Sequence, residues 1–433
     1  MSGPVAAALF DPSTETLDRQ SLRNLQLRRV QQLLDEIVPA NAFYARKFGG
    51  HRRLDSWDAF AELPFTTKQE LAEDQALSPP FGTNLSYPIQ RYTRLHQTSG
   101  TTGKAPIRWL DTDQSWDWWA RCWGHVYTGA GVGPGDRVFF AFSFGPFIGF
   151  WAAYEGTRTV GAMSVPGGGM QTDQRLQAIV DNDVTVVCCT PTYALRLADE
   201  ADRLGMDLAG SNVRATVHAG EPGASIPAIR ARIEQAFGAR CYDHTGMTEL
   251  GATGFTCQEQ TGVHLIESEF VFEVVDPRTL EPVPTGEQGE LVATNLGRWG
   301  MPVIRYRTGD LVRLDALPCA CGRTFARLAG GILGRADDML VVRGVNVFPS
   351  AIEGVVREFP EVSEFRIEVF NQRSMSEVKV LLDPAPSAAA DMPQRVASRL
   401  HDRLMLRVAC EVVPAGSLPR FELKARRVVR HDA

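Results

Sequence analysis

The sequence predicts an α/β protein with a large N-terminal domain and a small α+β domain at its C-terminal end. Short apolar runs at residues 138–142, 184–190 and 213–219 alternate with helical patterns, which is typical of a parallel sheet covered by helices. Residues 273–294 alternate apolar and polar positions around a Pro-rich turn, which predicts an antiparallel β subdomain. The large domain should therefore combine a parallel and an antiparallel part.

The boundary between the two domains is predicted at residues 335/336. A polar segment at residues 334–339 interrupts two apolar stretches there, as linkers between domains commonly do. Beyond it, helical patterns at residues 349–359 and 393–406 alternate with strand-like runs. The two domains would span residues 1–335 and 336–433.

Two helices are predicted before the first ligand-binding motif. Apolar residues recur at helical spacing between residues 17 and 48, with an interruption at Pro39. Residues 66–70 read Thr-Thr-Lys-Gln-Glu, and a threonine followed three residues later by Gln or Glu marks a capped helix start. Packing is the favoured explanation for the tryptophans of a later segment, which are Trp109, Trp116, Trp118, Trp119 and Trp123.

The composition argues against several classes of partner. With 45 basic and 51 acidic residues among 433, the chain lacks the positive charge expected for binding nucleic acid or an anionic membrane. An apolar run at residues 138–154 approaches membrane-spanning length, but Gly145-Pro146 divides it into a strand and a helix. The first residues lack the features of a signal peptide, so a cytoplasmic protein is expected, and a homodimer is left open.

A run of small hydroxyl residues and glycines, closed by a lysine, predicts a triphosphate-binding loop. Such residues let backbone N–H groups curl around a polyanion, and the lysine adds a positive charge. Only two residues separate the glycines, so the run is not the P-loop of nucleotide hydrolases. A polar surface loop is the alternative. The run is Gln97, Thr98, Ser99, Gly100, Thr101, Thr102, Gly103 and Lys104.

Two acidic residues are candidates for nucleotide binding. Residues 241–249 follow a strand-like run, and Thr248 and Glu249 come just past an expected turn at Gly246, where they could hold Mg²⁺ and a phosphate oxygen. Asp310 follows Gly309 and could accept hydrogen bonds from both ribose hydroxyls. An acidic loop and an Asx turn are the respective alternatives.

The cysteines suggest a metal site. Eight cysteines in a chain without a secretion signal argue for thiols or metal ligands rather than disulfides. Cys319 and Cys321 lie in a predicted turn, while Cys257 and His264 belong to the antiparallel region. Three thiolates and one imidazole could enclose a structural Zn²⁺, although reduced cysteines packed in a β subdomain are the alternative.

Taken together, these motifs resemble the adenylate-forming acyl-CoA synthetase superfamily, most closely its phenylacetate-CoA ligase-like branch. The resemblance extends from about residue 63 to residue 427, with the motifs in the family order. The segment at residues 343–349, Arg-Gly-Val-Asn-Val-Phe-Pro, is the most diagnostic for the branch. The family fold implies a large adenylate-forming domain and a mobile C-terminal domain.

The resemblance implies roles for individual residues. Lys104, Thr248, the Mg²⁺-binding Glu249 and the C-terminal Lys424 would be catalytic, and Asp310 would hold the ribose. Arg335 or Arg323 would lie near the nucleotide or the domain joint. Further ATP- or AMP-binding candidates are Glu221, Pro222, Asp243, His244, Thr245, Gly246 and Met247. The acyl pocket would include Phe144, Phe147, Gly167, Gly168, His218, Ala219 and Gly220. Asp337 would be the hinge, and Arg343 and Gly344 would line a coenzyme A channel.

The implied reaction has two steps. A carboxylate attacks the α-phosphate of ATP, with Mg²⁺ neutralising charge, and the thiol of coenzyme A then displaces AMP from the acyl adenylate. Aromatic residues with glycines between them favour a flat aryl or arylacetic acid. The alternatives are transfer to a carrier protein or an amine, and a non-catalytic protein that only binds nucleotide or aryl acid.

Two residues depart from the family pattern. Thr245 stands where most relatives carry a tyrosine that packs on adenine, and His244 or His218 is the candidate to replace that ring. Leu423 stands where a glycine commonly precedes the catalytic lysine.

Overall fold

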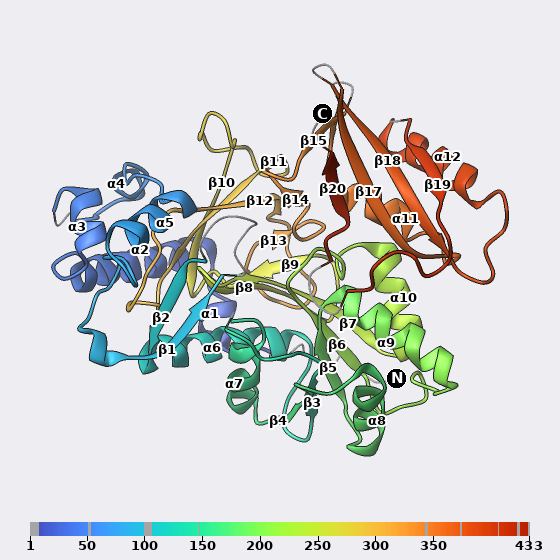
Figure 1. Ribbon diagram of the computed structural model, residues 1–433. Coiled ribbons are helices and arrows are strands. Elements are labelled where there is room, and N and C mark those ends of the chain that lie inside the picture. The colour runs from blue at the N-terminus through green and yellow to red at the C-terminus, as the bar shows by residue number, and fades with distance from the viewer. Residues whose placement is uncertain are drawn as a thin grey trace.

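A twelve-stranded sheet forms the centre of the large domain in the computed structural model (Figure 1). The structure describes residues 8–50, 53–98, 106–146, 148–342, 345–372, 375–405, 407–421 and 425–431. The strand order of the twelve-stranded sheet is β10-β11-β12-β13-β9-β8-β7-β6-β5-β3-β4, and β14 pairs with β12.

Half of this sheet is parallel, as the alternation of apolar runs and helical patterns predicted. Its strands are β3 (Arg137–Phe140), β4 (Met163–Pro166), β5 (Val186–Cys189), β6 (Ala215–His218) and β7 (Arg240–Met247). Alternate strand residues enter two separate apolar cores. One face packs against α6 (Asp113–Gly129) and α7 (Trp151–Val160), and the other against α8 (Thr172–Asp181), α9 (Pro191–Leu204) and α10 (Pro227–Phe237).

The other half of the sheet is antiparallel, which confirms the prediction for residues 273–294. It consists of β8 (Gly251–Thr256), β9 (Val263–Leu265), β10 (Phe270–Val275), β11 (Gln288–Asn295), β12 (Tyr306–Asp315), β13 (Arg327–Leu328) and β14 (Gly334–Arg335). Strand β7 joins the halves, because it pairs in parallel with β6 and antiparallel with β8. The turn expected at Gly246 is wrong, since this residue still pairs with Ala252 of β8.

Five helices and a two-stranded ladder precede the sheet. They are α1 (Pro12–Glu15), α2 (Arg19–Ile37), α3 (Ala42–Phe48), α4 (Trp57–Ala61) and α5 (Lys68–Leu77), followed by a 3₁₀ turn (Ile89–Arg91), β1 (Tyr92–Gln97) and β2 (Arg108–Thr112). Helices α2 and α3 confirm the expected helical pattern and its interruption near Pro39. Thr67 caps α5 in a capping box with Glu70, as the local sequence indicated.

The small domain has its own sheet and its own apolar core. Its elements are β15 (Leu340–Val342), β16 (Val345–Val347), α11 (Pro349–Val356), β17 (Val362–Gln372), β18 (Met375–Pro384), α12 (Met392–Leu404), β19 (Ala409–Val412) and β20 (Val428–His431). Because β14 pairs with the large sheet and β15 with the small one, the two sheets separate between Arg335 and Leu340. The boundary at 335/336 stays our proposal.

Two expectations about apolar segments can be compared with the structure. No helix in the described part of the chain is long and apolar enough to cross a membrane. The apolar run at residues 138–154 forms β3 and the start of α7 instead.

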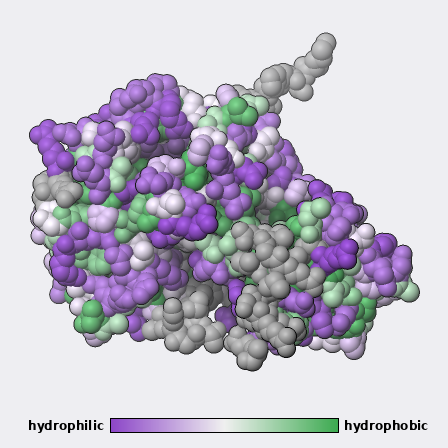
Figure 2. Space-filling view, turned by 90° about the horizontal axis from the view of Figure 1, so that it is seen from above, coloured by the Kyte–Doolittle hydropathy of each residue, from purple (hydrophilic) through white to green (hydrophobic). Residues whose placement is uncertain are grey.

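All the tryptophans at residues 109–123 are buried in the large core, as expected for packing residues. On the face seen in Figure 2, hydrophobic residues are scattered among hydrophilic ones.

Candidate active site

Two of the candidate catalytic residues, Thr248 and Glu249, lie in the turn that follows β7. Glu249 is the second residue after β7 and is only 5% exposed. Its Oε1 atom lies 3.3 Å from Nζ of Lys68 and 3.5 Å from the hydroxyl of Tyr306. A carboxylate is the ligand type that Mg²⁺ prefers, and a site with one carboxylate suits a metal that also binds phosphates. Glu249 therefore fits the predicted role.

A fully buried ion pair supports the backbone under this carboxylate. Arg298 pairs with Asp111 through bonds of 2.7 and 2.8 Å. The remaining Nη1 donates to the carbonyl oxygens of Thr248 at 2.6 Å and Glu249 at 3.2 Å. The guanidinium also lies 5.0 Å from the Trp109 ring. Arg298 thus fixes the position of the turn that carries the candidate Mg²⁺ ligand.

The candidate ribose and hinge residues are connected through one arginine. Arg335 Nη1 lies 3.2 Å from Oδ1 of Asp310, and its Nε donates to Oδ1 of Asp337 at 2.9 Å. Asp310 and Arg335 are paired residues of β12 and β14. The structure therefore brings the two nucleotide-binding candidates together and places the candidate hinge beside them.

Glu221 connects the large domain with the end of the small one. Its Oε1 accepts a bond from the Thr192 amide at the start of α9, and its Oε2 accepts one from the Ala425 amide, both at 2.9 Å. Ala425 is the residue after Lys424. The end of the chain that carries the candidate lysine therefore contacts the candidate nucleotide loop at Glu221.

Neighbouring residues of β7 point to opposite sides of the sheet. Asp243 receives a hydrogen bond from Ser225, and its burial raises the pKa of this carboxyl to about 6 despite that bond. His244 packs on Trp123 in the core on the other face, with ring centroids 4.3 Å apart. Thr245 bonds Thr253 at 3.1 Å between their Oγ1 atoms. The strand thus separates two sets of candidate residues.

A row of aromatic rings connects the segment after β3 with β7. The ring of Phe144 lies 6.0 Å from that of Phe142, which lies 5.1 Å from Phe150. Phe150 in turn lies 6.1 Å from Trp123, which contacts His244. This aromatic row, Phe144, Phe142, Phe150 and Trp123, therefore leads from one strand end to β7.

The remaining acyl-pocket candidates divide between the two faces. A Cβ on Gly168 would stand 3.2 Å from the Phe144 ring, and Ala219 packs against the same core. Gly167 lies under Phe139, and a Cβ there would stand 2.6 Å from the carbonyl oxygen of Phe140. Gly220, with φ +98°, has a backbone conformation that favours glycine.

His218 lies on the opposite face, away from the aromatic row. Its Nε2 lies 2.8 Å from Thr216 Oγ1, and its Nδ1 lies 3.2 Å from the Cys189 carbonyl. Burial lowers the pKa of His218 to about 4, so the ring is neutral near pH 7. Both ring nitrogens of His218 therefore already have partners within the protein. The place of His218 in the acyl pocket stays a prediction.

Other predicted residues are placed as follows. Thr98 is buried and bonds Ile107 at the end of the β1–β2 ladder. Pro222 is exposed, Met247 packs on the large core, and Gly246 lies against the backbone of Gly251. The candidates outside the described residues are Ser99, Gly100, Thr101, Thr102, Gly103, Lys104, Phe147, Arg343, Gly344 and Lys424, together with the departure at Leu423.

The four candidate zinc ligands do come together. The ligand atoms of Cys257, His264, Cys319 and Cys321 all lie within 4.8 Å of one another. His264 Nδ1 contacts the carbonyl oxygen of Phe325 at 3.1 Å, which leaves Nε2 to face the Cys321 sulfur. A backbone partner of this kind commonly orients a metal-binding imidazole. The donor set and its geometry fit a closed tetrahedral site.

Several residues of the site were not predicted. Lys68, Tyr306 and Arg298 come from distant segments and have no local signal, because their role depends on contacts with residues 111 and 249. Of the two arginines offered for the nucleotide or the domain joint, Arg335 lies beside Asp310 and Asp337. Arg323, the other alternative, instead pairs with buried Glu15 near the N-terminus. A charged pair far apart in sequence cannot be recognised from either residue alone.

Comparison with known proteins assigns the family. A model described as AMP-binding enzyme matches residues 95–297, and one described as AMP-binding enzyme C-terminal domain matches residues 344–431. The chain is 32% identical to a phenylacetate-coenzyme A ligase of Thermus thermophilus over 97% of this chain and 99% of the relative. This chain belongs to the phenylacetate-CoA ligase family. Like other members of that family, it is an AMP-forming acid–thiol ligase.

Solved structures also indicate which domain arrangement this ligase adopts. A 2-hydroxyisobutyryl-CoA ligase in its postadenylation state is similar with a TM-score of 0.93, at 30% identity over 100% of this chain and 94% of the other. The same enzyme with coenzyme A in its thioesterification state gives 0.75, at 31% identity over 99% and 94%. The arrangement of the two domains therefore resembles the postadenylation form.

Proposed function

We propose that this ligase activates an aryl or arylacetic acid with ATP and transfers the acyl group to coenzyme A. The aromatic row carries the proposal, because it ends at the strand that leads to Glu249. Flat rings against flat rings bury apolar area well, whereas a long acyl chain gains nothing specific from such a wall. The products would be an aryl-CoA thioester, AMP and pyrophosphate.

In the first step, a carboxylate oxygen attacks the α-phosphorus of ATP and the bond to pyrophosphate breaks. Glu249 would hold Mg²⁺, which neutralises charge on the phosphates when bound. Asp310 would orient the ribose, and Lys424 would approach the α-phosphate while Glu221 holds the neighbouring Ala425. The residues at 98–104 would bind the triphosphate.

In the second step, the thiol of coenzyme A attacks the acyl carbon and AMP leaves. The small domain would rotate about Asp337, which withdraws Lys424 and opens a channel near Arg343 and Gly344. The position of Asp337 in the segment between β14 and β15, where the two sheets separate, supports this role. Cytoplasmic location and a homodimer stay predictions.

An exchange assay tests the function. We expect pyrophosphate exchange into ATP that depends on aryl or arylacetic acids, and AMP release with thioester formation only after coenzyme A is added. Exchange without thioester formation would favour a carrier protein or an amine as acceptor. Absence of exchange over the whole acid panel would leave a protein that only binds its ligands.

We also propose that Cys257, His264, Cys319 and Cys321 hold a structural Zn²⁺. The cluster lies in the β subdomain and uses all four ligand positions, which supports a structural role rather than a catalytic one. Elemental analysis should find one zinc per chain, and chelation should lower the thermal midpoint of unfolding. A Cys321→Ser variant should lose the metal, whereas Cys122→Ser, a buried cysteine outside the cluster, should retain it. Metal-free protein of unchanged stability would contradict the site.

A further inference from the structure

His244 ends the aromatic row with a polar group. Its ring lies 4.3 Å from that of Trp123, and only 7% of the residue is exposed. The neighbouring rings of Phe150 and Phe142 are also buried. A histidine therefore stands in a wall that is otherwise apolar.

One hydrogen bond fixes the tautomer of this histidine. Nδ1 lies 2.9 Å from the carbonyl oxygen of Gly254, which can only accept, so Nδ1 carries the proton. Burial lowers the pKa of His244 to about 4, so the ring is neutral near pH 7. The lone pair is then on Nε2.

The Nε2 atom has no hydrogen-bond partner among the residues that the structure describes. It lies 3.2 Å from the position that a Cβ on Gly246 would take, beside the backbone that leads to Thr248 and Glu249. Nε2 is not among the fully buried unpaired polar atoms of the described residues, so a donor group from outside the protein can reach it. His218 cannot have the same role, because both of its ring nitrogens are already bonded.

We infer that His244 is a specificity-determining residue of the acid pocket, and that its Nε2 accepts a hydrogen bond from a hydroxyl or amino substituent of the substrate. This inference rests on the proposed function, since it assumes that the aromatic row contacts the acid. The preferred substrate is then a hydroxylated or amino-substituted aryl acid rather than an unsubstituted one. The ring of the acid packs on the row, and its donor reaches His244.

Matched acids test this inference. Acid-dependent pyrophosphate exchange is measured with hydroxy-, amino- and methyl-substituted benzoates and phenylacetates, in which the methyl group has the size of the donor but cannot donate. The wild-type enzyme should show a kcat/KM ratio of donor to methyl acid of about ten or more for at least one ring position. His244→Leu should bring that ratio to about one, and His244→Asn, which keeps an acceptor, should retain part of it. His401→Leu, which changes an exposed side chain of α12 in the small domain, should keep the wild-type ratio.

The outcomes separate this inference from the proposed function. Equal use of donor and methyl acids by the wild-type enzyme, or a preference that survives in His244→Leu, would overturn the role of His244 alone. Absence of exchange with every acid would overturn both. If His244→Leu does not fold, the ¹⁵N resonance of His244 Nε2 in the wild-type enzyme is followed instead. It should shift when the preferred hydroxy acid binds but not with its methyl analogue, and equal shifts would again overturn the role.

Discussion

Glu15 is a fully buried carboxylate that fastens the N-terminal segment to the large domain. It accepts hydrogen bonds from the amides of Phe10 and Asp11, both at 2.8 Å. On its other side it contacts Nδ1 of His125 at 3.1 Å and pairs with Arg323. Burial by itself would raise the pKa of Glu15, but the hydrogen bond with His125 and the charge of Arg323 lower it to about 2.

The lowered pKa of Glu15 predicts a loss of stability in acid. A carboxyl whose pKa falls from 4.5 to about 2 on folding stabilises the protein above pH 4.5, and this contribution disappears as the pH falls towards 2. Glu15→Gln should therefore lower the free energy of unfolding by about 3 kcal/mol at pH 7. Urea unfolding followed by tryptophan fluorescence measures it.

The control is Glu287→Gln, which changes an exposed carboxylate and should leave the free energy of unfolding nearly unchanged. The difference between wild type and Glu15→Gln should also shrink below pH 4. A difference that stays constant down to pH 3 would show that the charge of Glu15 is not responsible.

Helix α5 illustrates how one element serves both stability and the site. Its first residue is Lys68, whose ammonium pairs with Glu249. Thr67 Oγ1 accepts from the Glu70 amide at 3.2 Å, and Glu70 Oε2 accepts from the Thr67 amide at 2.8 Å. Thr66 exchanges backbone hydrogen bonds with Arg305 and Arg307, which attaches the helix start to the beginning of β12. The cap therefore helps to position Lys68.

Loss of the helix cap should destabilise the protein modestly. Thr67→Ala leaves an amide of the first turn without its side-chain acceptor, and about 1 kcal/mol of the free energy of unfolding should be lost. Thr67→Ser keeps the hydroxyl and should stay within a few tenths of a kcal/mol of the wild type. Urea titration compares the three proteins, and equal loss in both variants would mean that the threonine methyl group, not the cap, is important.

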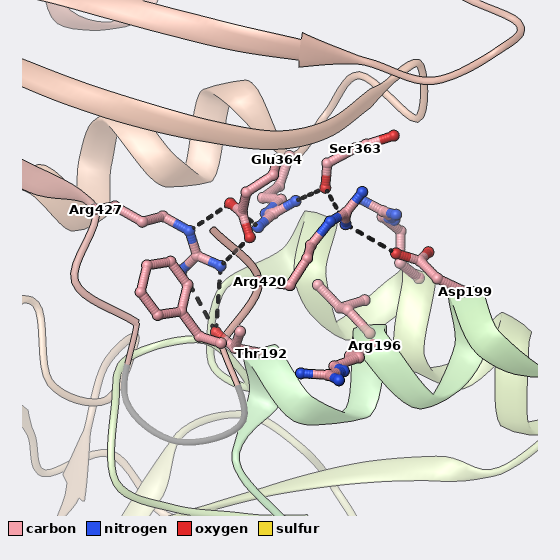
Figure 3. A pocket seen from close by; sticks show the side chains of 11 residues that line it. Thr192, Arg196, Asp199, Ser363, Glu364, Arg420 and Arg427 are labelled. Atoms are coloured by element: carbon pink, nitrogen blue, oxygen red, sulfur yellow. Dashed lines mark hydrogen bonds and ion pairs between the residues drawn. The ribbon is translucent and has the colours of Figure 1, made fainter. Parts of the chain in front are cut away.

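At the scale of the whole molecule, the small domain meets α9 and α10 around a pocket lined mainly by polar and charged residues (Figure 3). Arg427 pairs with Glu353 and Glu364 of its own domain, and its hydrogen bonds to the large domain, within the described residues, go to the Thr192 hydroxyl at 3.4 Å. Arg420 pairs with Asp199 at 3.3 Å, with both side chains about half exposed. Such contacts are weak enough to be broken and remade when domains move.

Glu221 should matter for the first step in particular. Glu221→Ala removes the acceptor that holds the amides of Thr192 and Ala425, so adenylate formation should fall about tenfold or more. Thioester formation from preformed acyl adenylate should change much less, because the small domain has then moved away. Asp199→Asn, which affects only an exposed ion pair, is the control and should alter neither step by more than about twofold. Equal loss of both steps in Glu221→Ala would contradict this account.

Lys424 provides the strongest test of the two-step mechanism. We expect Lys424→Ala to abolish adenylate formation, measured by pyrophosphate exchange, and to spare thioester formation from preformed acyl adenylate. Asp337→Pro should have the opposite effect, since a restricted hinge impairs only the rotation. If Lys424→Ala lost both activities equally, the lysine would not act on the α-phosphate alone.

The sequence alone was sufficient for the fold class and for the family. Apolar periodicity is a local property, so the parallel strands, the antiparallel region and both helices of the small domain could be read from neighbouring residues. The Cys-x-Cys turn and the acidic residues at 249 and 310 were also recognisable, because their chemistry is specific and their spacing is short.

Only the tertiary structure decided which of these residues act together. The contacts of Lys68 and Tyr306 with Glu249, of Arg298 with Asp111, and of Arg323 with Glu15 join segments far apart in the chain, and no local pattern encodes them. The opposite directions of Asp243 and His244 likewise became meaningful only once α6 covered one face of β7. Local chemistry determines what a side chain can do, but the partner that makes it act is set by packing across the whole molecule.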